Sequence, residues 1–140
     1  MTNTVFVVDG GQEVGLGHVY ESTTLAKEVE TVSDVVVVSL SNSAEVTGTL
    51  EQHGFVPTVI QESDLPSHLE TLDPDTIVIN LPWIDEKLVA RIKSTLDSKL
   101  IVYGNTSTNL SPAATEYCDV VVAPNSIEDG FGGRTYTGEN

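Results

Sequence analysis

The chain has 140 residues, the usual size of one domain, and 39% of them are apolar, which suffices for a single core. Twenty-one acidic residues oppose six basic ones, so the formal net charge is −15. Such a balance disfavours nucleic acid and anionic membranes as partners, because binding to either needs lysine and arginine.

The same charge repels itself unless salt screens it, so it indicates the cytoplasm of a halophile. No apolar run approaches the roughly 20 residues of a membrane helix, and the N-terminus lacks the pattern of a signal peptide. We therefore expect a cytoplasmic protein with no membrane insertion. Cys118 is the one cysteine and the three histidines are dispersed, so we expect no disulfide, no metal site and no cofactor.

Strands alternate with helices along the chain, and the strands are apolar runs, which is typical of a parallel sheet covered on both faces. In chain order the sequence predicts a strand over Thr4–Val8, a helix over His18–Val29, a strand over Asp34–Leu40, a helix over Ala44–His53, a strand over Val56–Ile60, a short helix or turn over Asp64–Leu72, a strand over Asp75–Asn80, a helix over Asp85–Leu96, a strand over Leu100–Tyr103, a short helix over Leu110–Tyr117 and a strand over Asp119–Ala123.

Six such strands predict an α/β fold, a doubly wound and mostly parallel Rossmann-like sheet with helices on both faces and the strand order 3-2-1-4-5-6. We assign residues 1–124 to this N-terminal domain. Residues 125–140 contain four glycines and few apolar residues. They are expected to form a linker-like tail toward a C-terminal domain.

The loop between the first strand and the first helix is the strongest candidate for a binding site. Ligands of open α/β sheets bind at the carboxyl ends of strands, where the strand order reverses, and N–H groups at a helix start favour anions. We predict ligand contacts from the loop and from the ends of the fourth and fifth strands, at Asp9, Gly10, Gly11, Gly15, Gly17, Asn80 and Asn105. Tyr20 stands where a dinucleotide fingerprint has its third glycine, so the loop does not match that motif. His18 and Val19 stand where a P-loop has its lysine and hydroxyl residue, so the loop does not match that motif either.

His18 is the candidate catalytic residue. An unperturbed imidazole titrates at about pH 6.5, so it can gain or lose a proton at neutral pH. A helix N-terminus favours its neutral form, which suits a general base. The alternative is that His18 caps the helix or fills space.

The segment from Asp9 to Lys27, with Gly15, Gly17 and His18, resembles the start of the UDP-sugar hydrolases of pseudaminic acid synthesis and of the related spore-coat polysaccharide biosynthesis proteins. The segments Asp119–Asn125 and Gly133–Tyr136 resemble their passage toward a second domain. These families share the two-domain GT-B fold of the bacterial lipid II N-acetylglucosaminyltransferase.

The resemblance implies the sugar- or acceptor-side domain of a nucleotide-sugar hydrolase or glycosyltransferase in surface polysaccharide or glycan biosynthesis. His18 would activate water or another acceptor. A UDP-sugar would be held together with a C-terminal domain, so this domain alone would be inactive.

Three positions depart from the family pattern. Glu21 stands where the family has arginine, and Asn80 and Asn105 stand where it has acids. These departures favour an alternative, a non-catalytic α/β domain that binds a ligand or a partner. The sequence leaves open which sugar and acceptor are used, and it leaves the oligomeric state undefined.

Overall fold

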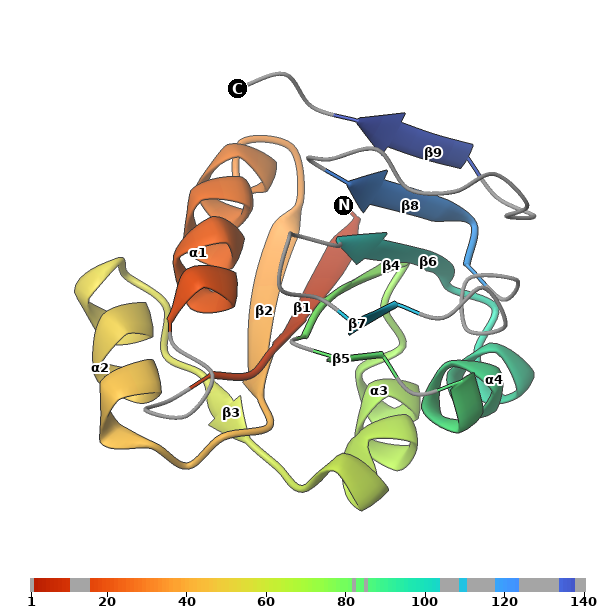
Figure 1. Ribbon diagram of the computed structural model, residues 1–140, viewed down its shortest axis with the longest axis horizontal. Coiled ribbons are helices and arrows are strands. Elements are labelled where there is room, and N and C mark those ends of the chain that lie inside the picture. The colour runs from red at the N-terminus through yellow and green to blue at the C-terminus, as the bar shows by residue number, and fades with distance from the viewer. Residues whose placement is uncertain are drawn as a thin grey trace.

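A parallel sheet runs through the computed structural model, which describes residues 2–10, 16–81, 83–84, 86–103, 109–110, 118–123 and 134–137. The sheet has seven strands in the order β3-β2-β1-β4-β6-β8-β9, and every neighbouring pair is parallel (Figure 1). The strands are β1 (Asn3–Val8), β2 (Asp34–Ser39), β3 (Thr58–Val59), β4 (Thr76–Asn80), β6 (Lys99–Tyr103), β8 (Val120–Ala123) and β9 (Arg134–Thr137). The predicted order of the first six strands is confirmed.

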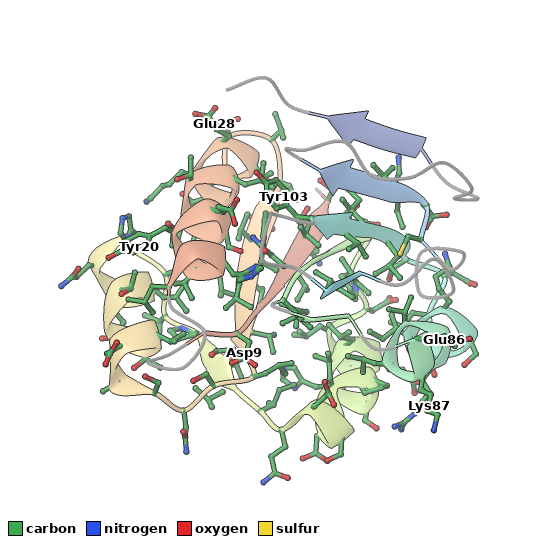
Figure 2. The ribbon with its side chains drawn as sticks, in the orientation of Figure 1. Asp9, Tyr20, Glu28, Glu86, Lys87 and Tyr103 are labelled. Carbon is green, nitrogen blue, oxygen red and sulfur yellow. The ribbon has the colours of Figure 1, made fainter. Side chains whose placement is uncertain are left out.

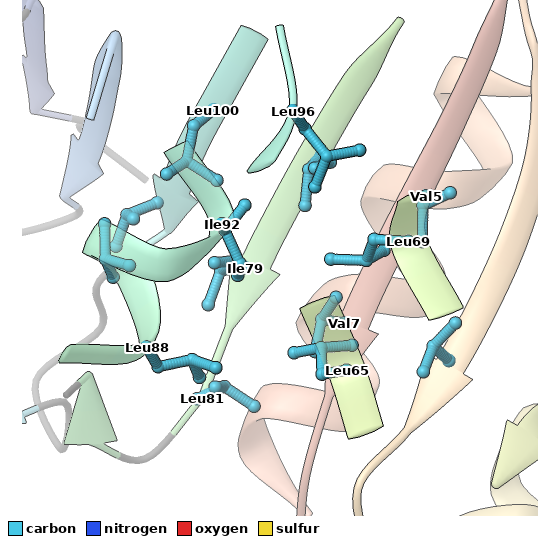
Figure 3. Close-up of a cluster of buried hydrophobic side chains, with 14 of the residues drawn as sticks. Val5, Val7, Leu65, Leu69, Ile79, Leu81, Leu88, Ile92, Leu96 and Leu100 are labelled. Atoms are coloured by element: carbon cyan, nitrogen blue, oxygen red, sulfur yellow. The ribbon is translucent and has the colours of Figure 1, made fainter. Parts of the chain in front are cut away.

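Helices cover both faces of the sheet because side chains alternate along each strand. Phe6 and Val8 of β1 pack in one core cluster with residues of α1 (Gly17–Val29) and α2 (Ala44–Gln52). Val5 and Val7 pack in the other cluster, with residues of α3 (Leu65–Leu72) and α4 (Glu86–Thr95), as Figure 3 shows. The predicted fold class, a doubly wound Rossmann-like α/β sheet, is confirmed.

The second helix illustrates how local sequence sets the element ends. The Ser43 hydroxyl accepts a hydrogen bond from the Glu45 N–H at 3.2 Å and caps α2. Gly54 follows the helix with φ of +89°, a conformation that glycine adopts without steric cost. A Cβ at Gly54 would also lie 3.1 Å from Lys27 Nζ.

The tail differs from its prediction. Residues 125–140 were expected to be linker-like, but Arg134–Thr137 form β9, which pairs in parallel with β8 from Val120 to Ala123. Threonine and tyrosine favour strands, and the exposed edge of β8 offers them backbone partners. The sheet therefore extends beyond residue 124.

Three further expectations meet the structure only in part. The third strand is limited to Thr58–Val59 because only Val38 and Ser39 pair with it. Leu110, expected to begin a helix, instead belongs to β7 (Asn109–Leu110), which pairs with β5 (Trp83–Ile84). The rest of that predicted helix, residues 111–117, lies outside the described residues. Asp85, the first residue of the helix expected over Asp85–Leu96, lies outside them as well. Across the described helices, none has the length and apolar character needed to cross a membrane.

Candidate functional site

The strand order reverses between β1 and β4, so the candidate site is built there. Val8 at the end of β1 is in register with Asn80 at the end of β4. The chain leaves β1 for α1 on one face of the sheet and leaves β4 for α4 on the other. In open α/β sheets, ligands bind at such a reversal of strand order.

His18 and Asn80 meet at this point. His18 Nδ1 lies 2.6 Å from Asn80 Oδ1. Asn80 Nδ2 donates to the His18 backbone carbonyl at 3.1 Å and to Ser22 Oγ at 3.1 Å. His18, Ser22 and Asn80 are 1%, 2% and 2% exposed, so these hydrogen bonds are shielded from bulk water. The amide of Asn80 is thus bonded at both ends to the first turns of α1.

These contacts exclude one alternative for His18, that it caps the helix. The N-cap of α1 is Leu16, and no side chain caps the helix, so His18 is not its cap. Asn80 was expected to contact a ligand, but its amide is directed at His18 and Ser22 within the protein. Ser22 was not singled out from the sequence. Its position one turn after His18 on the same helix face is the signal that could have identified it.

Asp9 stands directly after β1, at the same edge of the sheet (Figure 2). Its Oδ1 accepts a hydrogen bond from the Gly10 N–H at 2.8 Å. Burial raises the pKa of the Asp9 carboxyl above its ordinary value, while the Gly10 hydrogen bond and nearby His18 act in the opposite direction. A carboxyl with a raised pKa at a strand end is a group of the kind found in functional sites.

Tyr103 ends β6 and brings a second titratable side chain with a raised pKa to the carboxyl edge (Figure 2). Burial raises the pKa of the Tyr103 phenol, and the charge of Glu21 and the hydrogen bond to its carboxylate raise it further. The two residues thus form a contact between α1 and β6, which only the packing of the helix on the sheet could establish.

An open hollow of about 500 Å³ lies beside Asp9, over the ends of β1, β2 and β3. The described residues that line it are Asp9, Leu40, Ser41, Asn42, Val59, Ile60 and Gln61. They supply one carboxylate, one hydroxyl, two amides and three aliphatic side chains, and none of them is basic. Neither His18 nor Asn80 is among these lining residues, but Asp9 is, and its carboxyl interacts electrostatically with His18.

The remaining predicted site residues divide into two groups. Gly10 is buried beside Asp9, and Gly17 begins α1, where a Cβ would meet no atom within 4 Å. Space alone therefore does not require glycine at position 17. Gly11, Gly15 and Asn105 lie outside the described residues. Within the part of the chain that the structure describes, no group of three or more His, Cys, Asp or Glu residues could hold a metal ion.

Comparison with known proteins finds an uncharacterized relative and a distantly similar solved structure. No family model matches this chain. It is 29% identical over 119 residues to an uncharacterized protein of Methanocaldococcus jannaschii. That match covers 83% of this chain and 23% of the relative, so the chain spans about a quarter of the relative's length.

Among solved structures, the chain resembles the D-arabinose dehydrogenase from Sulfolobus solfataricus with a TM-score of 0.47 and 16% identity. The match covers 82% of this chain and 35% of that chain.

Proposed function

We propose that this chain is the sugar- or acceptor-side domain of a nucleotide-sugar hydrolase or glycosyltransferase, with His18 as its general base. The observation that carries the proposal is the position of His18. Its ring is bonded to Asn80 at 2.6 Å at the point where the strand order reverses. A base must be held in a defined orientation near the place where ligands bind; the hydrogen bond to Asn80 supports the first condition, and the position at the reversal of strand order supports the second.

The hollow beside Asp9 supports the sugar side of the proposal. Its aliphatic side chains suit the C–H faces of a sugar ring, and its carboxylate, hydroxyl and amides suit hydroxyl groups. A diphosphate needs cationic partners, and the described lining residues provide none. The nucleotide would therefore rest mainly on a second domain. The M. jannaschii relative, of which the matched part is only 23%, has room for further domains.

In the proposed reaction, His18 takes the proton of an attacking water or acceptor hydroxyl. The oxygen of that group forms a bond to the anomeric carbon of the sugar. The bond from that carbon to the diphosphate oxygen breaks, and the diphosphate leaves with the bonding electrons. Asp9, which lines the hollow and interacts electrostatically with His18, would orient the hydroxyl group.

One observation favours the alternative, a non-catalytic domain that binds a ligand or a partner. His18 is only 1% exposed, and a base must reach its substrate. In that alternative the His18–Asn80–Ser22 hydrogen bonds serve to hold α1 on the sheet.

The test is made in the complete protein that contains this domain. His18→Asn should lower turnover of a UDP-sugar by roughly 10²- to 10⁴-fold, the scale of general acid–base catalysis, while nucleotide binding changes far less. His53→Asn, at the C-terminal end of α2, is the matched control and should leave turnover intact. Residues 1–140 alone should show no turnover, because the second reactant is not positioned. Full activity of His18→Asn would contradict the proposal.

A further inference from the structure

We infer that Asn80 is a positioning residue that holds neutral His18 in the Nδ1–H tautomer, so that Nε2 is the nitrogen able to accept a proton. Ser22 completes the arrangement by fixing the orientation of the Asn80 amide. The catalytic meaning of this inference rests on the proposed function, but the tautomer itself does not.

The orientation of the amide follows from its partners. A backbone carbonyl oxygen only accepts hydrogen bonds, so the Asn80 atom 3.1 Å from the His18 carbonyl must be the NH₂ nitrogen. The reversed amide would place two oxygens against each other in a buried site. Ser22 Oγ, 3.1 Å from the same nitrogen, accepts its second hydrogen.

The tautomer follows from the amide. Asn80 Oδ1 then faces His18 Nδ1 at 2.6 Å, and this oxygen carries no hydrogen. The hydrogen between them must therefore belong to Nδ1. A neutral imidazole has one N–H, so its lone pair lies on Nε2. The Nδ1–H form is the minor tautomer of free histidine, which makes it a clear signature of an imposed arrangement.

Burial strengthens the preference of His18 for the Nδ1–H tautomer. At 1–2% exposure, bulk water cannot replace a lost partner for any of the three groups. The other neutral tautomer would place the Nδ1 lone pair against the Asn80 oxygen in this shielded site, which is unfavourable. Asn80 thus acts on His18 as an orienting partner acts on a catalytic histidine, through the ring nitrogen that does not react.

The test is nitrogen NMR of the chain with ¹⁵N-labelled histidine, at a pH where the imidazole is neutral. The wild type should give a protonated-type shift at Nδ1 and an unprotonated-type shift at Nε2 of His18. Asn80→Leu should move His18 toward a mixture dominated by the Nε2–H form. Asn42→Leu, which changes an exposed asparagine at the same edge of the sheet, is the control and should leave the wild-type pattern unchanged.

Ser22→Ala provides a second variant should Asn80→Leu fail to fold. It removes one acceptor of the Asn80 amide and should weaken the preference for Nδ1–H without abolishing it. An Nε2–H wild type, or a pure Nδ1–H form in Asn80→Leu, would overturn the inference.

The complete protein separates this inference from the proposed function. If both hold, Asn80→Leu should lower kcat by roughly 10- to 10⁴-fold, the range seen when the partner of a functional histidine is removed. KM should change little. An Nδ1–H tautomer together with full turnover by His18→Asn would leave the inference intact and refute the proposed function.

Discussion

The buried pair of His18 and Asn80 predicts a measurable coupling in stability. Three variants test it: Asn80→Leu, His18→Phe and the double variant. Asn80→Leu leaves His18 Nδ1 without its partner, while the His18 carbonyl, which also accepts the backbone hydrogen bond of α1, and Ser22 each lose one hydrogen bond. His18→Phe leaves Asn80 Oδ1 without its partner, while the backbone carbonyl of residue 18 is retained.

The magnitude follows from counting buried groups that lose their hydrogen bonds. Each such group costs about 1–3 kcal/mol of the free energy of unfolding. Asn80→Leu strands one group, His18 Nδ1, so we expect about 1–3 kcal/mol. His18→Phe strands one group, Asn80 Oδ1, so we expect about 1–3 kcal/mol. In the double variant neither of these two groups is present, so its cost should fall below the sum by about 1–3 kcal/mol.

Urea unfolding followed by far-UV circular dichroism, in molar KCl, measures these differences. The wild type should tolerate them because domains have unfolding free energies of about 5–15 kcal/mol. A cost for Asn80→Leu under about 0.5 kcal/mol, or a double variant that equals the sum within about 0.5 kcal/mol, would refute the reasoning.

Three further predictions concern charge and titration. Because the net charge is −15, the melting temperature should rise markedly between low and molar KCl; an unchanged midpoint would remove the argument for a halophile. Burial first, and then the charge of Asp119, raise the pKa of the Cys118 thiol to about 12, so iodoacetamide at about pH 8 should label it only after unfolding, and rapid native labelling would contradict its burial. Burial raises the pKa of Asp119, but the Leu100 N–H, Lys93 and Lys99 outweigh it and hold that pKa below its ordinary value. The resulting stability is present above about pH 4 and is lost as the pH falls through the folded pKa, so acid titration of Asp119→Asn should lack this part of the loss.

Much of the fold could be predicted because its signals are local. Apolar runs such as Val35–Val38 specify strands wherever they lie, and the alternation with helices leaves few ways to build a sheet. The Ser43 cap and the Gly54 helix end depend on neighbours within a few residues. For the same reason the placement of His18 in the first turn of α1 could be predicted.

The predictions for β3 and for the tail were less accurate for the opposite reason. Valine favours strands, but Val56 is 82% exposed and lies outside β3. β3 extends only where β2 offers backbone partners. Arg134–Thr137 have few apolar residues, yet the open edge of β8 makes them a strand. Strand pairing at an edge is decided by backbone partners that are distant in sequence, and composition does not record them.

The candidate site shows the same division. The sequence by itself determined that His18 follows a glycine-containing loop at the end of the first strand, because the strand, the loop and the helix are consecutive. Only the tertiary structure decided what His18 meets. Asn80 lies 62 residues away, and the parallel register that pairs Val8 with Asn80 brings its amide to the imidazole. Since a shift of one residue would turn the Asn80 side chain to the opposite face of the sheet, its role depends on that register and not on the asparagine alone.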